Sequence, residues 1–393
     1  MHNVLFISVD SLRFDKVAVM PTVKKLAEEG LFFTQHFTVA NGSMPSHCSI
    51  FTGKYPQHHG VRENGVKLPD VRTLAQILRE QGFKTTGFVS SILLDSYYGI
   101  NAGFDEYSNA SKHPWVEHYL TKIGYGKYNV QRVLWYLGLH DGRTRSCHQV
   151  NKDVLAWLDK NNDKFFMFVH YFDIHRDTYG NKKRIVEKHS NYDHNARLID
   201  SAIAQVIEKL REKGQLEKTM VVIFSDHGES LDSNDKGHGK NVKDEEFHTP
   251  FIIYNSRNVK SQIKALSRTI DMAPTVLSLL KINSEGNEHV HGMDGTNILA
   301  HEAEEVFMEA YPPYGDVKAV RTLQWKFVLT DGVHQQLFDM QNDPHETTNV
   351  LEENISVAQQ LRTKLKRHFK VEFTQQELDE VTKERLKGLG YLD

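Results

Sequence analysis

Short, continuous apolar runs alternate with amphipathic stretches along most of this chain. Four of the runs are rich in β-branched and aromatic residues, which is typical of strands buried on both faces of a parallel sheet. These runs are Val4–Val9, Phe165–Phe172, Met220–Phe224 and Phe251–Tyr254. Helical spacing relates the apolar residues of two intervening stretches, Val71, Leu74, Ala75 and Leu78, and then Ile199, Ile203, Val206 and Leu210. The alternation predicts an α/β fold over residues 1–300, with a doubly wound, mostly parallel sheet flanked by helices.

The pattern changes after residue 300. Asp331-Gly332 marks a tight turn between short β-like runs, and a charged helical segment, Ile355–Phe369, follows them. The runs predict a small antiparallel sheet on which this helix packs. We therefore expect an α/β domain over residues 1–300 and a C-terminal subdomain over residues 301–393. The runs are Val317–Arg321, Lys326–Thr330 and Gln335–Phe338.

Charge and cysteine content exclude several classes of protein. The 393 residues carry 48 Lys and Arg against 51 Asp and Glu, and this balance gives no argument for nucleic acid or an anionic membrane as a partner. No apolar run approaches the roughly 18 residues of a membrane-spanning helix, and Val4–Val9 is too short for a signal-peptide core. Cys48 and Cys147 make no disulfide framework. The sequence thus predicts a cytoplasmic protein.

Metal- or proton-binding side chains follow three of the predicted strands. Asp10 follows the first, Asp173 and His175 follow the second, and Ser225-Asp226-His227-Gly228-Glu229 follows the third. Because ligands of open α/β sheets bind at the carboxyl ends of the strands, these groups are expected to converge on one crevice. Each cluster alone is equally explained as the cap of a following helix. The three together favour a metal site of carboxylate oxygens with one imidazole.

A serine between turn-forming residues adds a candidate nucleophile. Gly42, Ser43 and Pro45 come just before a helix that is expected from Ser46 onward. A hydroxyl at a helix N-terminus that also faces a metal is suited to nucleophilic attack, because the helix dipole and the cation both stabilise its alkoxide. Taken in isolation, Ser43 is more simply explained as a helix-capping serine.

An ordered set of motifs resembles the sulfatase family. Ser43-Met44-Pro45-Ser46-His47 with Thr52-Gly53 resembles the family signature, Cys or Ser-x-Pro-Ser-Arg followed by Thr-Gly. The family belongs to the alkaline phosphatase superfamily, and the resemblance implies a metal-dependent hydrolase of sulfate or phosphate esters. The other motifs occur in the family's order and are Asn3–Ile7 with Asp10, Ser225–Glu229, Gly237–Lys240 before Pro250–Ile253, Asp271–Thr275, Leu337–Asp339, Asp343–Glu346 and Leu386–Tyr391.

The resemblance implies a set of metal ligands. Asp10, Asp226 and His227 would bind one divalent ion, and Ser43 would be both a ligand and the nucleophile. Most family members have a second Asp where this chain has Ser11, and the later pair often has Asn where this chain has His227. The exchange resembles the phosphonate monoester hydrolase branch. It favours manganese, while calcium, magnesium and zinc are the alternatives.

The resemblance also implies groups that contact the substrate. His175 resembles the family histidine that contacts the transferred group or the leaving oxygen, and Lys240 resembles the lysine that neutralises the sulfate. His238 and His47 would belong to the same site. His47 stands where the family has Arg, and an imidazole is not the permanent, forked donor that a guanidinium is. From the residues alone, His175, Lys240, His238 and His248 are also compatible with positions outside a site.

The chemical state of Ser43 decides which substrate is expected. In the family a maturation enzyme oxidises this residue to formylglycine, whose hydrate has one hydroxyl to attack sulfur and another to expel sulfate. We therefore expect hydrolysis of the sulfate monoester of a saccharide or another small molecule. An unmodified Ser43 would instead favour phosphodiester or phosphonate-ester hydrolysis, or phosphoryl transfer, and a non-catalytic binding protein is a third hypothesis. Segment 111–150, an expected insertion or lid, and segment 176–192 would select the leaving group.

Overall fold

The structure is a computed structural model that describes residues 3–110, 144–176, 188–231, 237–255, 260–282, 292–311 and 315–369. Most of segment 111–150, the expected insertion or lid, therefore lies outside the described residues. Most of segment 176–192 and the closing motif Leu386–Tyr391 also lie outside them.

A sheet of 8 strands forms the centre of the molecule, in the order β4-β3-β5-β1-β6-β7-β2-β8. β1 lies in its middle, parallel to β5 on one side and to β6 on the other, and all of its residues are buried. The predicted α/β fold with a mostly parallel sheet is confirmed. The strands are β1 (Asn3–Val9), β2 (Leu31–Phe37), β3 (Lys84–Phe88), β4 (Glu106–Ser108), β5 (Phe165–Tyr171), β6 (Thr219–Phe224), β7 (Phe251–Tyr254) and β8 (Ser261–Arg268).

The prediction of a parallel strand at Phe251–Tyr254 was wrong in its direction, because β7 runs antiparallel to both of its neighbours, β6 and β2. A fully buried strand is the same apolar run in either direction, so its sequence carries no signal for orientation. β2, β3, β4 and β8 were not predicted. Polar residues interrupt these strands, so their sequences have only a weak strand pattern. Pairing with neighbouring strands stabilises them as strands nevertheless.

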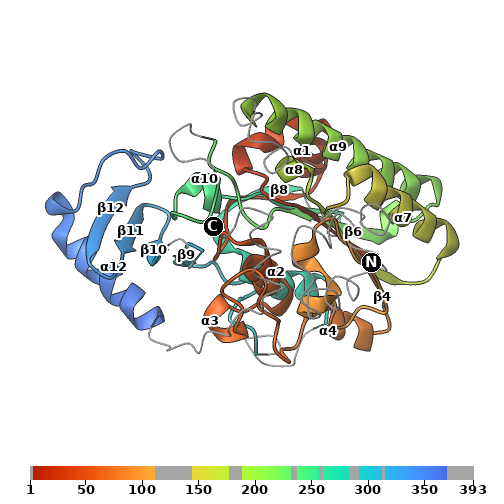
Figure 1. The fold of residues 1–393 in the computed structure, drawn as a ribbon, viewed down its shortest axis with the longest axis horizontal. Helices are drawn as coiled ribbons and strands as arrows, with labels where there is room; N and C mark the ends of the chain where they lie inside the picture. Colours follow the sequence, from red (N-terminus) through yellow and green to blue (C-terminus); the bar gives the residue numbers. More distant parts are fainter. Residues whose placement is uncertain are drawn as a thin grey trace, which may run out of the picture.

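Helices cover both faces of the sheet (Figure 1). Leu5 and Ile7 of β1 share one core with α1, α7 and α9, whereas Val4 and Phe6 share the other core with α2, α4 and α11. Alternate residues of a strand point to opposite faces, so β1 contributes to both cores. The helices of this part are α1 (Pro21–Glu29), α2 (Ser43–Thr52), α3 (Pro56–His59), α4 (Leu74–Glu80), α7 (Cys147–Lys160), α8 (Asp173–Arg176), α9 (Lys188–Glu212), α10 (Asp244–Phe247) and α11 (Met272–Leu279).

The helix predicted around Ile199–Leu210 is confirmed, and its apolar positions are buried in α9. The boundaries of two other helices differ from the prediction. α4 begins only at Leu74, because the Thr73 side chain caps it by accepting a hydrogen bond from the Gln76 backbone N–H, and Val71 lies outside the helix. α2 begins at Ser43 instead of Ser46, because Gly42 is its N-cap.

The predicted antiparallel sheet at the C-terminal end is confirmed and has 4 strands, in the order β12-β11-β10-β9. Asp331 and Gly332 both have positive φ, 50° and 69°, as the predicted turn between β11 and β12 requires. Leu361 and Leu365 of α12 pack on this sheet. The elements are β9 (Val306–Glu309), β10 (Val317–Arg321), β11 (Trp325–Thr330), β12 (His334–Asp339) and α12 (Ile355–His368).

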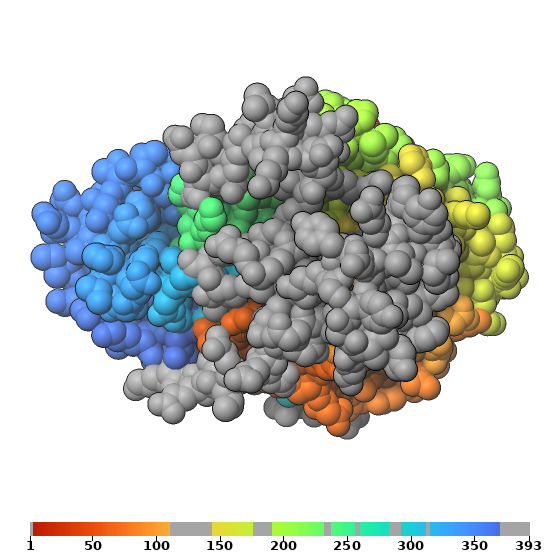
Figure 2. Space-filling view, in the orientation of Figure 1, coloured from red at the N-terminus to blue at the C-terminus, as the bar shows by residue number. Residues whose placement is uncertain are grey.

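The C-terminal sheet lies against the α10 segment of the large sheet's domain, as the adjoining blue and green surfaces in Figure 2 show. Lys326 of β11 is fully buried there and forms ion pairs with Asp244 of α10 and with Glu346, each at 2.9 Å. The boundary at residue 300 stays a prediction. None of the helices in the described part of the chain combines the length and apolar character needed to span a membrane, and the cytoplasmic location also stays a prediction.

Candidate active site

The carboxyl ends of three neighbouring parallel strands bring together three of the predicted metal ligands and His175, which was predicted to contact the substrate. Asp10 directly follows β1, His175 lies in α8 after β5, and Asp226 and His227 follow β6. All four side chains are fully buried. The structure therefore contains the convergence that the strand ends predicted.

Asp10, Asp226 and His227, which we call the carboxylate group, each offer one ligand atom within 4.8 Å of the others. His227 Nε2 lies 3.4 Å from Asp226 Oδ2 and 4.0 Å from Asp10 Oδ1. Asp226 Oδ2 is buried and has no hydrogen-bond partner among the described residues. A buried carboxylate oxygen without a donor is costly, and a cation would compensate for its lost hydration. These residues therefore fit the divalent ion that the sequence predicts.

The pKa shifts of the carboxylate group also indicate a place for a cation. Burial and the charge of Asp10 raise the pKa of Asp226. Burial would also raise the pKa of Asp10, but the charge of His175 and the hydrogen bonds from His170 and His175 outweigh it and hold this pKa well below its usual range. Burial would lower the pKa of His227, whereas Asp226 and Asp10 raise it. Negative charge is thus concentrated in a desolvated place, where a divalent cation is stabilising.

The hydroxyl of Ser43 faces the carboxylate group from the first turn of α2. Its Oγ lies 3.3 Å from His227 Nε2, and the residue is fully buried. Gly42 is the N-cap of this helix, so the alternative explanation of Ser43 as the capping residue was wrong. In this turn Pro45 has no N–H and the Met44 N–H donates to Asn64 Oδ1 at 2.9 Å, so the partial positive charge near the hydroxyl is that of the helix dipole. Ser43 thus lies next to the candidate metal ligands.

The neutral side chain of His47 is bound to this turn by a hydrogen bond. Its Nδ1 donates a hydrogen bond to the Ser43 carbonyl oxygen at 2.7 Å, which leaves Nε2 to accept one from Ser8 Oγ at 2.9 Å. Burial, with a smaller effect of His170, lowers the pKa of His47 to about 3. His47 therefore holds the backbone of the turn that contains Ser43, and it does not supply the positive charge of the family's Arg.

Ser11 is a central residue that the sequence analysis treated only as a missing carboxylate. Its backbone is left-handed, with a φ of 60°. Its backbone N–H donates a hydrogen bond to Asp226 Oδ1 at 3.2 Å, and its hydroxyl lies 2.6 Å from His175 Nε2 and 3.3 Å from His227 Nδ1. Ser11 thus joins the ends of three strands by hydrogen bonds.

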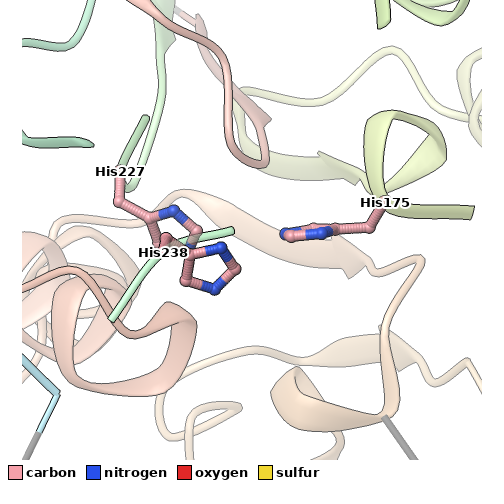
Figure 3. A group of neighbouring side chains, drawn as sticks. All are labelled: His175, His227 and His238. Atoms are coloured by element: carbon pink, nitrogen blue, oxygen red, sulfur yellow. The ribbon is translucent and has the colours of Figure 1, made fainter. Parts of the chain in front are cut away.

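Three buried imidazoles, His175, His227 and His238, lie close together (Figure 3), and His227 also belongs to the carboxylate group. The ring centroids of His227 and His238 are 4.1 Å apart, and those of His175 and His238 are 5.0 Å apart. Burial and the charge of His227 lower the pKa of His238 to about 4. The structure therefore brings His175 and His238 to the site, in agreement with the sequence analysis.

Lys240 and His248 lie outside the buried groups of the site. Lys240 is exposed to solvent, so it lies at the outside of the buried groups. His248 does not join them, because its ring stacks on Phe14 and Phe37 at centroid distances of 4.1 and 4.7 Å, and its Nε2 hydrogen-bonds the Thr34 carbonyl oxygen. The sequence left open whether His248 belongs to a site, and the structure places it outside these groups.

Two residues of the site were missed by the sequence analysis. His170, the penultimate residue of β5, places Nε2 3.1 Å from Asp10 Oδ2. Glu246 of α10 accepts hydrogen bonds from the Gly239 backbone N–H and from Asn41 Nδ2 at 2.8 and 2.7 Å. It thereby ties the loop of His238 to the segment before Ser43. The period-2 pattern of β5 could have indicated His170, since it shares a face of the strand with Phe166 and Phe168, which lie in the core that contains α2. Glu246 had no local signal.

The sequence matches family models over most of its length. A model described as Sulfatase matches residues 2–282, and one described as the C-terminal part of N-sulphoglucosamine sulphohydrolase matches residues 238–374. The chain belongs to the sulfatase family. The resemblance that the motifs indicated is thereby confirmed.

Several named proteins are similar to this sulfatase-family chain. The ulvan-active sulfatase of Formosa agariphila is 25% identical over 89% of this chain and 77% of its own length. Arylsulfatase K of Bos taurus is 27% identical, but over 42% of this chain, which spans only 34% of that relative. The inner membrane protein YejM of Salmonella typhi is 22% identical over 87% of this chain, which spans 52% of that relative.

Solved structures share the fold. The phosphonate monoester hydrolase of Agrobacterium radiobacter superposes with a TM-score of 0.71 and 18% identity, covering 93% of this chain and 95% of the hydrolase. A protein solved in complex with its substrate, D-glucosamine-2-N,6-O-disulfate, has a TM-score of 0.73 and 17% identity, covering 94% of this chain and 97% of that protein. Both catalytic branches named in the sequence analysis are thus represented on this fold.

Proposed function

We propose that this chain is a metal-dependent hydrolase of sulfate monoesters, with Ser43, matured to formylglycine, as the nucleophile. One observation carries the proposal. The Ser43 hydroxyl lies 3.3 Å from His227, within a buried group that also contains Asp10 and Asp226. Membership of the sulfatase family supports the reaction class. Relatives named ulvan-active sulfatase and choline-sulfatase support a sulfated saccharide or another small sulfated alcohol as the substrate.

The ligands of the metal would be Asp10, Asp226, His227 and the residue at Ser43. A bound divalent ion would supply positive charge that stabilises the nucleophile and the ester oxygens. Two carboxylates with one imidazole suit manganese, and calcium, magnesium and zinc are the alternatives.

The protein's own residues would orient the reacting groups. His47 holds the carbonyl oxygen of Ser43 and therefore fixes the first turn of α2. His175 Nε2 lies 2.8 Å from Asp10 Oδ1 and 2.6 Å from Ser11 Oγ, so its ring has a defined orientation beside the ester site. We assign His175 the role of giving a proton to the leaving oxygen. Lys240, at the exposed side, would attract the anionic ester.

The ligand set gives a specific reason for a second candidate function. Ser11 replaces the second Asp of most sulfatases and His227 adds an imidazole, as in the phosphonate monoester hydrolase branch, and two such hydrolases share this fold. An unmodified Ser43 has one hydroxyl. Water can hydrolyse a seryl-phosphate, whereas a seryl-sulfate lacks an equally easy route. An unmodified Ser43 would therefore point to phosphodiester or phosphonate-ester hydrolysis, or to phosphoryl transfer.

The mass of the Ser43 peptide, measured on the sample used for assays, separates the two candidates. For the sulfatase we expect a peptide lighter by two hydrogen atoms, since a formylglycine maturation enzyme oxidises the serine, together with sulfate release from 4-nitrophenyl sulfate. For the second candidate we expect an unmodified peptide and hydrolysis of bis(4-nitrophenyl) phosphate with manganese.

The matched control uses two serines of the same helix. Ser43→Ala should abolish either activity, whereas Ser49→Ala, which removes a hydroxyl bound to His59, should retain it. A Ser43→Ala variant as active as the unsubstituted chain would refute the nucleophile. A folded, manganese-loaded chain inert toward both esters would favour the binding-protein hypothesis.

A further inference from the structure

The helix that begins with Ser43 receives no side-chain cap from its own N-cap residue. Gly42, the N-cap of α2, has no side chain, and Pro45 at the third helical position has no N–H. A Cβ atom on Gly42 would lie 2.9 Å from Cδ2 of Tyr311, so this ring leaves no room for a capping side chain unless it moves. The N–H groups of a first helical turn need acceptors, and a side-chain oxygen commonly supplies one. The cap of α2 therefore comes from elsewhere in the chain.

Asn64 supplies this cap from 20 residues further along the chain. Its Oδ1 accepts a hydrogen bond at 2.9 Å from the backbone N–H of Met44, the second helical residue, which is a donor that an N-cap side chain would bind. Asn64 and Met44 are both fully buried, so loss of the acceptor would leave a buried N–H without a partner. Because Met44 directly follows Ser43, this hydrogen bond fixes the backbone next to the candidate nucleophile.

Tyr311, two residues beyond β9 of the C-terminal sheet, holds Asn64 in turn. Its hydroxyl accepts a hydrogen bond from the Asn64 backbone N–H at 3.1 Å, and both residues are buried. A bidentate ion pair between Arg62 and Glu309, the last residue of β9, joins the same two segments. The end of β9 thus fixes the segment that caps α2.

We propose that Asn64 and Tyr311 are positioning residues for Ser43. Tyr311 fixes the backbone of Asn64, Asn64 fixes the first turn of α2, and this turn carries the Ser43 hydroxyl. Both residues act on the reaction through Ser43 and not through contact with the ester. Their hold on the turn depends only on these hydrogen bonds, whereas their effect on turnover rests on the proposed function. The C-terminal sheet then contributes to the active site through Tyr311.

Steady-state kinetics of a double-mutant cycle in the full chain test the proposal, with whichever of the two model esters the chain cleaves. Asn64→Ala should lower kcat by about 10–100-fold and Tyr311→Phe by about three- to tenfold, because each displaces the nucleophile. KM should change by less than about threefold, since no group that binds the ester is removed. Because Tyr311 acts through Asn64, kcat of the double variant should equal that of Asn64→Ala within about twofold.

Hydrogen exchange of the Met44 amide, resolved by fragmentation mass spectrometry, gives a second measurement that requires no activity. The amide should exchange at least roughly tenfold faster in Asn64→Ala than in the unsubstituted chain. Asn151→Ala is the matched control, because it removes another buried asparagine, whose Nδ2 binds the Ala202 carbonyl oxygen on the other face of the sheet. It should lower stability and leave kcat and the exchange of Met44 unchanged.

Circular dichroism checks that each variant is folded, and Tyr311→Phe, which keeps the ring, carries the test alone if Asn64→Ala does not fold. Losses of kcat that multiply in the double variant, or unchanged exchange of Met44 in folded Asn64→Ala, would overturn the positioning role and leave the proposed function intact. Faster exchange of Met44 in Asn64→Ala, in a chain that cleaves neither ester, would support the hold on this turn and contradict the proposed function.

Discussion

Two buried histidines of this protein, His47 and His59, use both ring nitrogens in hydrogen bonds that suit the neutral ring. His59 shows this most clearly, because its Nδ1 accepts from the Val61 backbone N–H at 3.1 Å and its Nε2 therefore donates to Ser49 Oγ at 3.0 Å. Burial lowers the pKa of His59 to about 3. A second proton would break the bond to Val61 and place a charge in the core.

This arrangement makes stability depend on pH. Between the unfolded pKa of 6.5 and the folded pKa of about 3, the unfolded chain binds more protons at His59, so stability falls as pH falls. Lowering the pH from 7 to 5 reduces the free energy of unfolding of the unsubstituted chain. We expect this reduction to be about 2 kcal/mol smaller in His59→Gln, which lacks the titrating imidazole. Urea denaturation at the two pH values measures the difference. His334→Gln, which replaces an exposed histidine, should show the same reduction as the unsubstituted chain. A reduction in His59→Gln equal to that of the unsubstituted chain would contradict the role of His59.

The residue at position 11 is expected to set the metal preference. Ser11 lies 3.3 Å from Asp10 Oδ1 with a φ of 60°, a conformation that Asp and Asn tolerate. Ser11→Asp would add an oxygen ligand and a negative charge, so we expect the affinity for calcium to rise at least roughly tenfold relative to that for manganese. Isothermal titration of the metal-free protein measures both affinities. Ser11→Asn, which lacks the charge, is the control and should shift the ratio much less.

Among the elements, the close approach of α10 to the segment after β6 positions the site. The backbone N–H of Gly228 donates to the Glu246 carbonyl oxygen at 2.7 Å. A Cβ atom on Gly228 would lie 2.1 Å from the Glu245 carbonyl oxygen, so no side chain fits there. The position of Asp226 and His227 therefore depends on a glycine two residues or fewer away.

Gly228→Ala is expected to force these segments apart and to reduce kcat/KM by about 100-fold, because a displacement near 1 Å is enough to misplace catalytic groups. Steady-state kinetics on the better of the two model esters measures the loss. Gly214→Ala, where a Cβ meets no atom within 4 Å, should cost only about 1–2 kcal/mol of backbone strain and keep its activity. Unchanged kinetics in Gly228→Ala would show that the contact does not position the site.

For the whole molecule, a network of ion pairs joins the C-terminal sheet to α10. Lys326, on the C-terminal sheet, pairs with Asp244 of α10, and Arg321 pairs with the same carboxylate at 3.0 Å. We expect Lys326→Met to lower the free energy of unfolding by about 3–5 kcal/mol, because it leaves buried carboxylates short of their partner. Chemical denaturation measures this change in the free energy of unfolding. Lys366→Met, at an exposed position of α12, should change stability by less than about 0.5 kcal/mol.

The sequence by itself determined the central strands, the antiparallel C-terminal sheet and the ordered motifs of the sulfatase family. Local patterns sufficed there, because burial on both faces leaves apolar runs and strand ends carry the functional groups. Asp10, Asp226 and His227 were found as candidates for this reason, and Ser43 from the motif that resembles the family signature.

Only the tertiary structure decided the direction of β7, the role of Ser11 and the neutral state of His47. Each depends on atoms far away in the sequence: the neighbours β6 and β2, the carboxylate of Asp226, and Ser8 under the turn of Ser43. The same holds for His175, His227 and His238, whose rings come from segments that meet only in the folded chain. Such long-range contacts determine hydrogen bonding and desolvation, and a local sequence pattern does not predict these contacts.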